Sequence, residues 1–386
     1  MVAVTPQPNA APMASAPDAP APRNLVGRWA DFWLLGGASI AFCLLFMIAA
    51  PLRGVMPSFE GSLLRIGAAG LLLSFFVNFP HFMASYRLAY GREKEFREQH
   101  RFELKIVPAV LSLIALTGVI VARTFDQVAS FSRTSILTGL GTLMFLSVGW
   151  HYVKQIYGCV RVCASFDGYT MDNRQMNIIR YGLFPMWLRS LMSVNEQAGS
   201  LAGLGYGWGG GPGWMIVLTN IAVAVGALAV VAMFVQNWMK SGQAPSLRMV
   251  VPIVAIYVWW VPAVRFGFPL PLVPFFHSLQ YIPFIAKVER SKAQDALAVR
   301  TETGVAPSVS VRARLTLVAT GLFMTGGLVM YGLPVTLDAL IGTREATGLY
   351  VMLIAVTLVI NVHHYFIDHV IWRLRDDAYT RDLLMR

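Results

Sequence analysis

Long apolar segments dominate the sequence and limit what this chain can fold into. A helix needs about 20 mostly apolar residues to cross the hydrocarbon core of a bilayer. Ten segments meet that requirement, at about residues 31–52, 63–86, 105–123, 135–157, 178–196, 213–236, 248–264, 268–286, 313–337 and 346–372. The sequence therefore predicts an all-α fold, a polytopic transmembrane helical bundle of about ten spans.

The composition excludes a water-soluble enzyme. Charged residues make up 13% of the chain and hydrophobic residues 56%, whereas soluble domains carry about 25% charged residues. The net charge of +11 does not indicate a nucleic-acid partner, because the basic residues lie between the apolar segments, as in polytopic membrane proteins. Three cysteines are too few for a secreted disulfide framework.

The chain divides into a tail and one domain. Residues 1–24 are rich in Ala and Pro, and we expect a disordered tail there. This segment lacks the basic region followed by an apolar region that a signal peptide needs. Residues 25–386 are expected to form a single transmembrane helical domain.

The basic residues predict the orientation in the membrane. Two of the ten spans are ambiguous, because the fifth contains Arg180 and Arg189, and only residues 265–267 separate the seventh from the eighth. With ten spans and a cytoplasmic N-terminus, most of the 31 Lys and Arg residues fall on the cytoplasmic side. Removing the fifth span, or fusing the seventh and eighth into one, would place the basic loop 287–314 outside. We therefore expect both termini in the cytoplasm, and a bacterial inner membrane as the location.

Histidines gather at one predicted depth of the bilayer. Six of the seven lie in four even-numbered spans, near the cytoplasmic end of each: His81, His151, His277, His363, His364 and His369. A single histidine inside a membrane is often only an interhelical hydrogen-bonding group. Independent structural histidines have no reason to share a depth, however, so the set predicts a metal or haem site in the inner leaflet.

Polar neighbours accompany these histidines at helical spacing. Gln155 follows His151 by four residues and Asp368 follows His364 by four, which places each pair on one helix face. Such groups can accept the second N–H of a metal-binding imidazole. Tyr365 lies at the same depth, where an interfacial aromatic belt is the simpler explanation. Asp368, Gln155 and Tyr365 are the catalytic candidates.

This donor set leaves several functions open. Neutral imidazoles with a carboxylate suit iron, zinc or copper, and with open positions they particularly suit non-haem iron and dioxygen. The leading hypothesis is an iron oxygenase that acts on a lipid, an isoprenoid or a carotenoid within the bilayer, with an electron donor protein as a possible partner. A haem-binding or quinol-linked electron-transfer subunit is the first alternative, and a transporter with a histidine proton relay is the second.

Single histidines dispersed over several helices resemble the Brp/Blh-type membrane β-carotene dioxygenases. That resemblance is one of architecture and implies one iron bound by histidines from different helices, with oxidative cleavage or hydroxylation of a polyene or lipid. Membrane desaturases and hydroxylases also gather histidines at the cytosolic face, but they use HxxxH and HxxHH boxes. This chain offers only His363 and His364, with His369 five residues after His364.

Overall fold

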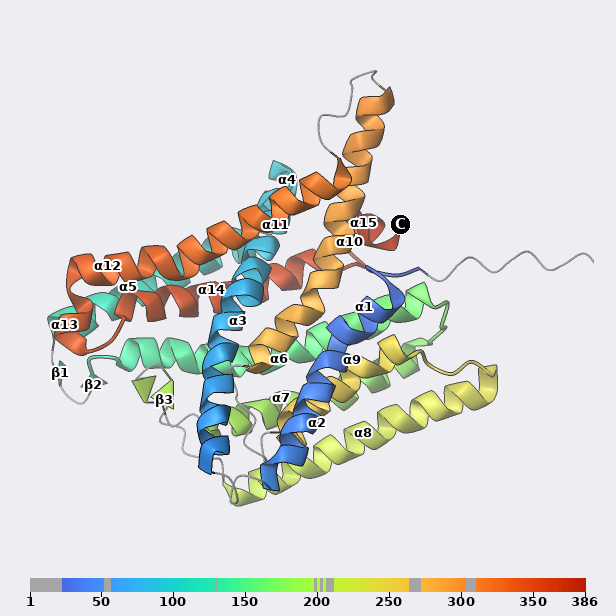
Figure 1. The fold of residues 1–386 in the computed structure, drawn as a ribbon, viewed down its shortest axis with the longest axis horizontal. Helices are drawn as coiled ribbons and strands as arrows, with labels where there is room; N and C mark the ends of the chain where they lie inside the picture. The colour runs from blue at the N-terminus through green and yellow to red at the C-terminus, as the bar shows by residue number, and fades with distance from the viewer. Residues whose placement is uncertain are drawn as a thin grey trace, which may run out of the picture.

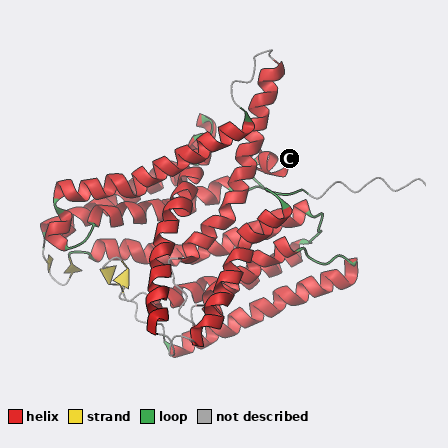
Figure 2. Cartoon of the chain, in the orientation of Figure 1, coloured by secondary structure: helices red, strands yellow, loops and turns green. Residues whose placement is uncertain are grey.

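The computed structural model describes residues 23–51, 57–125, 127–128, 131–197, 200–201, 204–205, 212–263, 272–302 and 310–386. These residues are almost entirely helical (Figure 1 and Figure 2). Most of the predicted tail lies outside the described residues. Arg23 and Asn24, at its end, contact the helical domain: Arg23 donates to the carbonyl of Met385 at 2.6 Å, and Asn24 accepts from Arg248 at 2.8 Å.

The elements follow one another as helices with short connections. In the first half of the chain they are α1 (Arg28–Phe32), η1 (Trp33–Gly37), α2 (Ala38–Ala49), α3 (Pro57–Tyr90), α4 (Lys94–Gln99), η3 (Phe102–Ile106), α5 (Val107–Thr124), α6 (Ser135–Phe166) and α7 (Asn173–Gln197). In the second half they are α8 (Gly213–Ser241), α9 (Leu247–Val258), η4 (Trp259–Ala263), α10 (Leu272–Glu302), α11 (Val311–Gly327), η5 (Leu328–Gly332), α12 (Leu333–Ile341), α13 (Thr343–Thr347), α14 (Val351–Ile371) and α15 (Ala378–Met385). The η segments are π-helical turns next to the α-helices, and η1 contains a kink at Gly36, whose backbone is not helical.

Two antiparallel hairpins of two-residue strands complete the described secondary structure. In the first, β1 (Gln127–Val128) pairs with β2 (Phe131–Ser132), so that Gln127 is opposite Ser132. In the second, β3 (Ser200–Leu201) pairs with β4 (Leu204–Gly205), so that Ser200 is opposite Gly205.

Among the described residues, six continuous helical stretches are long and apolar enough to cross a membrane. They are Arg28–Ala49, Phe102–Thr124, Ser135–Phe166, Gly213–Ser241, Val311–Ile341 and Val351–Ile371. They coincide with the first, third, fourth, sixth, ninth and tenth predicted spans, which confirms the all-helical class and supports these six spans as membrane-crossing candidates. The other predicted spans lie in α3, α7, α9 with η4, and α10. These helices are not among the six, so the total of ten spans stays a prediction.

Four long helices cross near the centre of the molecule and position the candidate site. In Figure 1, α3 and α10 run upward across α6 and α14. α3 contacts α10 and α14, and α14 also contacts α6. Each of the four helices therefore presents one face to the same small volume.

A buried carboxylate fixes the beginning of α14. Asp338 in α12 is fully buried and accepts hydrogen bonds from the backbone N–H groups of Met352 at 2.8 Å and Leu353 at 3.0 Å. Thr343 donates to the same side chain. The first N–H groups of a helix have no partner within the helix, and a carboxylate also interacts favourably with the positive end of the helix dipole. Asp338 therefore caps α14 from outside its own helix.

Two helices on the other side of the bundle approach each other at paired glycines. A Cβ atom added to Gly226 in α8 would lie 2.3 Å from the carbonyl oxygen of Gly182 in α7. No side chain fits in that space. Small residues let helices in membranes pack backbone against backbone, and Gly182 and Gly226 provide that contact here.

Candidate metal centre

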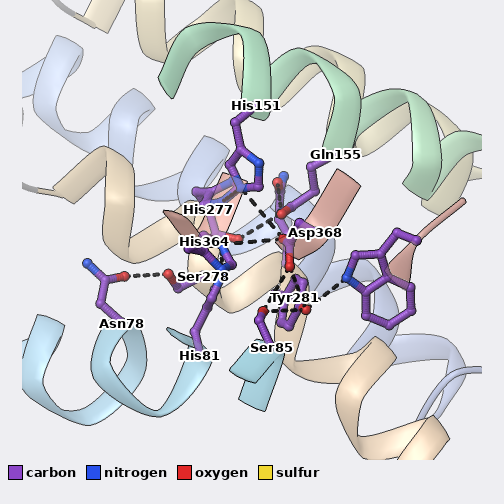
Figure 3. A network of polar contacts seen from close by, with 12 residues as sticks. Asn78, His81, Ser85, His151, Gln155, His277, Ser278, Tyr281, His364 and Asp368 are labelled. Atoms are coloured by element: carbon purple, nitrogen blue, oxygen red, sulfur yellow. Dashed lines mark hydrogen bonds and ion pairs between the residues drawn. The ribbon is translucent and has the colours of Figure 1, made fainter. Parts of the chain in front are cut away.

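Four histidines from four different helices meet at the crossing of α3, α6, α10 and α14. His81, His151, His277 and His364 are 3%, 6%, 4% and 1% exposed. Figure 3 shows their imidazoles directed toward one another. These four residues, here called the histidine cluster, were all predicted from the sequence as metal ligands.

The Nε2 atoms make the closest contacts in the histidine cluster. His81 Nε2 lies 2.8 Å from His364 Nε2, and His151 Nε2 lies 3.1 Å from His277 Nε2. Two groups of potential ligand atoms, each with all members within 4.8 Å of one another, share His364. One is His81, His277 and His364, and the other is His151, His364 and Asp368.

Asp368 places one carboxylate oxygen against the histidine cluster. Its Oδ2 atom is 3.3 Å from His364 Nε2 and 3.8 Å from His151 Nε2. Its Oδ1 atom accepts hydrogen bonds from Ser85 at 2.8 Å and from Tyr281 at 3.1 Å. Two donors thus hold the carboxylate from the far side. The sequence predicts that Asp368 accepts the second N–H of an imidazole, the one that does not bind the metal. In the structure, Asp368 instead lies against the Nε2 atoms of His364 and His151, which also contact the other cluster histidines.

The sequence analysis missed Ser85 and Tyr281 as members of this site. Their hydroxyl oxygens lie 2.7 Å apart, and Tyr281 also accepts a hydrogen bond from the indole N–H of Trp372 at 2.8 Å. Ser85 and Tyr281 each follow a cluster histidine by four residues, as Gln155 and Asp368 do. This His-x-x-x-polar spacing recurs on all four helices and is the signal that identifies them.

Aromatic rings cover three of the imidazoles. Tyr281 stacks on His81 with ring centroids 4.1 Å apart and an interplanar angle of 19°. The ring centroids of Tyr152 and His277 are also 4.1 Å apart. Tyr365, predicted as a catalytic residue, stacks on His151 at 4.7 Å and 29°. These rings restrict the rotation of the imidazoles, because each histidine is held between its own helix and an aromatic face.

Gln155 supports the cluster through the backbone rather than through an imidazole. Its side-chain nitrogen donates to the carbonyl of His277 at 2.9 Å and to Gln280 at 3.3 Å. Gln280 donates in turn to the carbonyl of Leu35 at 2.7 Å. Among the contacts of the described residues, Gln155 thus does not accept the second N–H of an imidazole, contrary to the prediction from the sequence. The two amides connect α6, α10 and η1 instead.

Two of the histidines predicted as ligands do not join the cluster. His363 is buried, but Tyr86 contacts its Nδ1 at 2.7 Å and the carbonyl of Glu103 contacts its Nε2 at 3.0 Å. Both ring nitrogens are thus engaged elsewhere, because consecutive helical residues differ in direction by about 100°. His369 is exposed, and its Nδ1 contacts Lys154 at 2.6 Å. Its position, five residues after His364, places it beyond the cluster.

The two ring nitrogens of the cluster histidines differ in their contacts. The Nδ1 atoms of His81, His277 and His364 are buried and have no hydrogen-bond partner among the described residues. The polar contacts of these three rings are thus concentrated at Nε2, on the inner side. An imidazole that binds a metal through Nε2 keeps its proton on Nδ1.

The site brings four imidazole nitrogens and one carboxylate oxygen close together, with nearest separations of 2.8 Å to 3.3 Å. These are the donors that first-row transition metals accept in proteins. No protein-family model matches the chain, and no curated protein or solved structure is significantly similar to it.

Proposed function

We propose that this chain is an integral-membrane metalloenzyme in which the histidine cluster and Asp368 bind one non-haem iron ion. The observation that carries the proposal is the convergence of four buried Nε2 atoms from four helices. An imidazole Nε2 can accept at most one hydrogen bond from another ring when both rings are neutral. A shared cation satisfies all four lone pairs at once.

The two closest separations between imidazole nitrogens match adjacent ligands of one ion. The two groups of three potential ligands share His364, and binding of all five donors to one ion requires the two groups to draw closer together. Two atoms that each lie about 2.1 Å from a metal are about 3.0 Å apart at a right angle, about 3.4 Å apart at the tetrahedral angle and about 4.2 Å apart when opposite. The two closest histidine pairs, at 2.8 Å and 3.1 Å, match a right angle best. Right angles between ligands are typical of six-coordinate ions, whereas zinc in structural sites prefers the tetrahedron.

Asp368 fits the role of a fifth ligand. Its Oδ2 atom lies 3.3 Å from His364 Nε2, between the separations for a right angle and for the tetrahedral angle, and 3.8 Å from His151 Nε2. Four imidazoles and one carboxylate oxygen would leave one position of an octahedron open. An open position on iron held by nitrogen and carboxylate ligands is where dioxygen or a substrate can bind.

The same distances exclude the two closest histidine pairs as axial ligands on opposite faces of a haem. Two histidines that bind a haem iron from opposite faces place their nitrogens about 4 Å apart, with the porphyrin plane between them. Neither of the two closest pairs in the cluster allows this, because their Nε2 atoms are 2.8 Å and 3.1 Å apart.

The location of the cluster within apolar helices supports a lipophilic substrate. His151 and His364 lie in two of the six stretches that are apolar enough to span a membrane. A substrate that partitions into lipid, such as a lipid, an isoprenoid or a carotenoid, could reach the site from the bilayer, while the packed helices exclude water from the reaction. We further propose ten spans, with both termini in the cytoplasm of a bacterium and the chain in its inner membrane, because this topology keeps the basic loop 287–314 inside.

Metal analysis of the purified protein tests the proposal. The full chain, extracted in detergent, should contain about one iron per polypeptide by mass spectrometry of the metal. It should also lack the Soret band of a haem protein. Alanine variants of His81, His151, His277 and His364 should each lose most of the iron. His369→Ala provides the matched control and should keep it, because His369 is exposed and apart from the cluster.

Two results would contradict the proposal. Wild-type iron content in His81→Ala and His364→Ala would exclude the histidine cluster as the metal site. A metal-free wild-type protein that cannot be loaded with iron, zinc or copper would favour a proton relay through the histidines. Zinc in place of iron would keep the site but remove the redox chemistry.

A further inference from the structure

The candidate metal centre has one aromatic connection toward the end of a membrane span. Tyr281 stacks on His81 at 4.1 Å, and its hydroxyl donates to Asp368. The indole of Trp372 donates to the same hydroxyl at 2.8 Å, and the two rings meet edge to face at 5.4 Å. Tyr281 therefore contacts two proposed metal ligands on one side and Trp372 on the other.

Trp372 lies where α14 leaves the proposed hydrocarbon region. The apolar span Val351–Ile371 ends one residue before it, and Trp372 itself is partly exposed. Tryptophan is common at this depth, where its N–H usually faces the headgroups or water. Here the N–H points inward and is bonded to a tyrosine that is 3% exposed. An interfacial anchor does not require that contact.

The path from the surface to the cluster is short and continuous. It consists of Trp372, Tyr281 and then either His81 by stacking or Asp368 by a hydrogen bond. Every step is a hydrogen bond or a ring contact with centroids at most 5.4 Å apart. Contacts of this kind couple electronic states far better than a gap through saturated side chains or lipid.

We propose that Trp372 and Tyr281 form the route by which an electron enters the metal centre from the membrane face at which α14 ends. The inference rests on the proposed function, since it requires a redox-active metal. In the step, a one-electron donor in the aqueous phase, such as a reduced flavin, would lose one electron, and ferric iron held by the histidine cluster would gain it. Trp372 and Tyr281 end the step unchanged, so no proton or atom is transferred.

The route assigns different tasks to two aromatic residues of the site. Tyr281 is a positioning residue that also links the ligands to Trp372. Trp372 is the terminal group that an aqueous donor can approach. The buried environment of the histidine cluster, at most 6% exposed, gives a water-soluble donor no direct contact with the ligands.

Anaerobic reduction of the ferric protein tests the route. The full chain, loaded with iron and embedded in lipid nanodiscs, is mixed with photoreduced flavin mononucleotide as the donor. The loss of the ferric electron paramagnetic resonance signal is then followed in time. Trp372→Phe should slow the reduction several-fold at wild-type iron content. Tyr281→Phe should slow it as well when the rates are compared at equal bound iron, because Tyr281 also donates to the proposed ligand Asp368. Both variants keep an aromatic ring but lose the hydrogen bond between the two residues.

Trp150→Phe is the matched control. Trp150 precedes His151 and packs against Phe184 and Trp187 at 4.8 Å and 5.5 Å, and no described contact connects it to Tyr281. It should be reduced at the wild-type rate. The reduction potential of each variant is measured in parallel, because Tyr281 also donates to Asp368 and its loss removes a hydrogen bond that stabilises that carboxylate.

The outcomes separate the route from the proposed function. Equal reduction rates in wild type and Trp372→Phe, at equal iron content, would overturn the route and leave the metal site intact. A slower rate in Trp372→Phe that is fully explained by a shifted potential would overturn it as well. A wild-type protein without any redox-active metal would overturn both proposals.

Discussion

The carboxylate of Asp368 divides its two oxygens between the proposed metal and the protein. Oδ2 lies 3.3 Å from Nε2 of His364, the residue one helical turn before Asp368 in α14. Oδ1 instead accepts a hydrogen bond from Ser85 at 2.8 Å. The oxygen nearest the cluster is thus free to bind a cation while the other fixes the orientation of the group. This division of roles distinguishes Asp368 from a carboxylate that only orients a histidine.

Asp368→Asn should weaken metal binding without preventing folding. The amide has the same shape and can still accept from Ser85, but it has no negative charge to offer a cation. We expect the affinity for Fe²⁺ to fall by at least about 10- to 100-fold, the usual effect of disturbing the groups around a metal. Competition with a chromogenic chelator measures this affinity. Asp376→Asn is the control, because Asp376 is exposed and pairs with Arg373; equal affinities in both variants would exclude Asp368 as a ligand.

Ser85→Ala should reduce the metal affinity less than Asp368→Asn does. The substitution removes one of two donors to Asp368 Oδ1 and leaves Tyr281 in place. A loss at the lower end of the range, about 10-fold, is expected for a residue that acts through a ligand. The comparison is Ser278→Ala, because Ser278 is also buried but donates to Asn78 instead. An affinity in Ser85→Ala equal to that of Ser278→Ala would show that the hydrogen bond to Asp368 has no effect on the metal.

The helical class and the four histidines that meet in the cluster were predicted from the sequence, but the choice among neighbouring histidines was not. The bilayer alone constrains the length of apolar segments and the positions of Lys and Arg, so these features can be read from the sequence without knowledge of tertiary contacts. His363 and His364 share a depth, and only helix rotation decides which faces the cluster. Asp368, four residues after His364, already marks that face. Ser85 and Tyr281 were missed because serine and tyrosine are common at span ends, and only their repeated spacing from His81 and His277 sets them apart.

His363→Ala should destabilise the fold without removing the metal. Both ring nitrogens of His363 are engaged, with Tyr86 at 2.7 Å and with the carbonyl of Glu103 at 3.0 Å. Loss of the ring leaves the hydroxyl of Tyr86 and the carbonyl of Glu103 without this hydrogen-bond partner, which lowers the free energy of unfolding by about 1–3 kcal/mol. We expect a lower midpoint of thermal unfolding in detergent and unchanged iron per polypeptide. Loss of iron in His363→Ala at a temperature where the protein is folded would place His363 in the site after all.

Asp338→Ala should act on the metal centre from a distance through α14. Asp338 caps the first turn of this helix by accepting from Met352 and Leu353, whereas His364 and Asp368 lie near its other end. Removing a cap costs about 0.5–2 kcal/mol, and the loss should appear first as fraying of the outer turn of α14. Hydrogen exchange should therefore increase at residues 351–355, while the affinity for Fe²⁺ changes little, because the packing around the histidine cluster is separate from the cap. If the affinity falls as far as it does in Asp368→Asn, the position of α14 along its axis depends on Asp338, and the cap belongs to the architecture of the site.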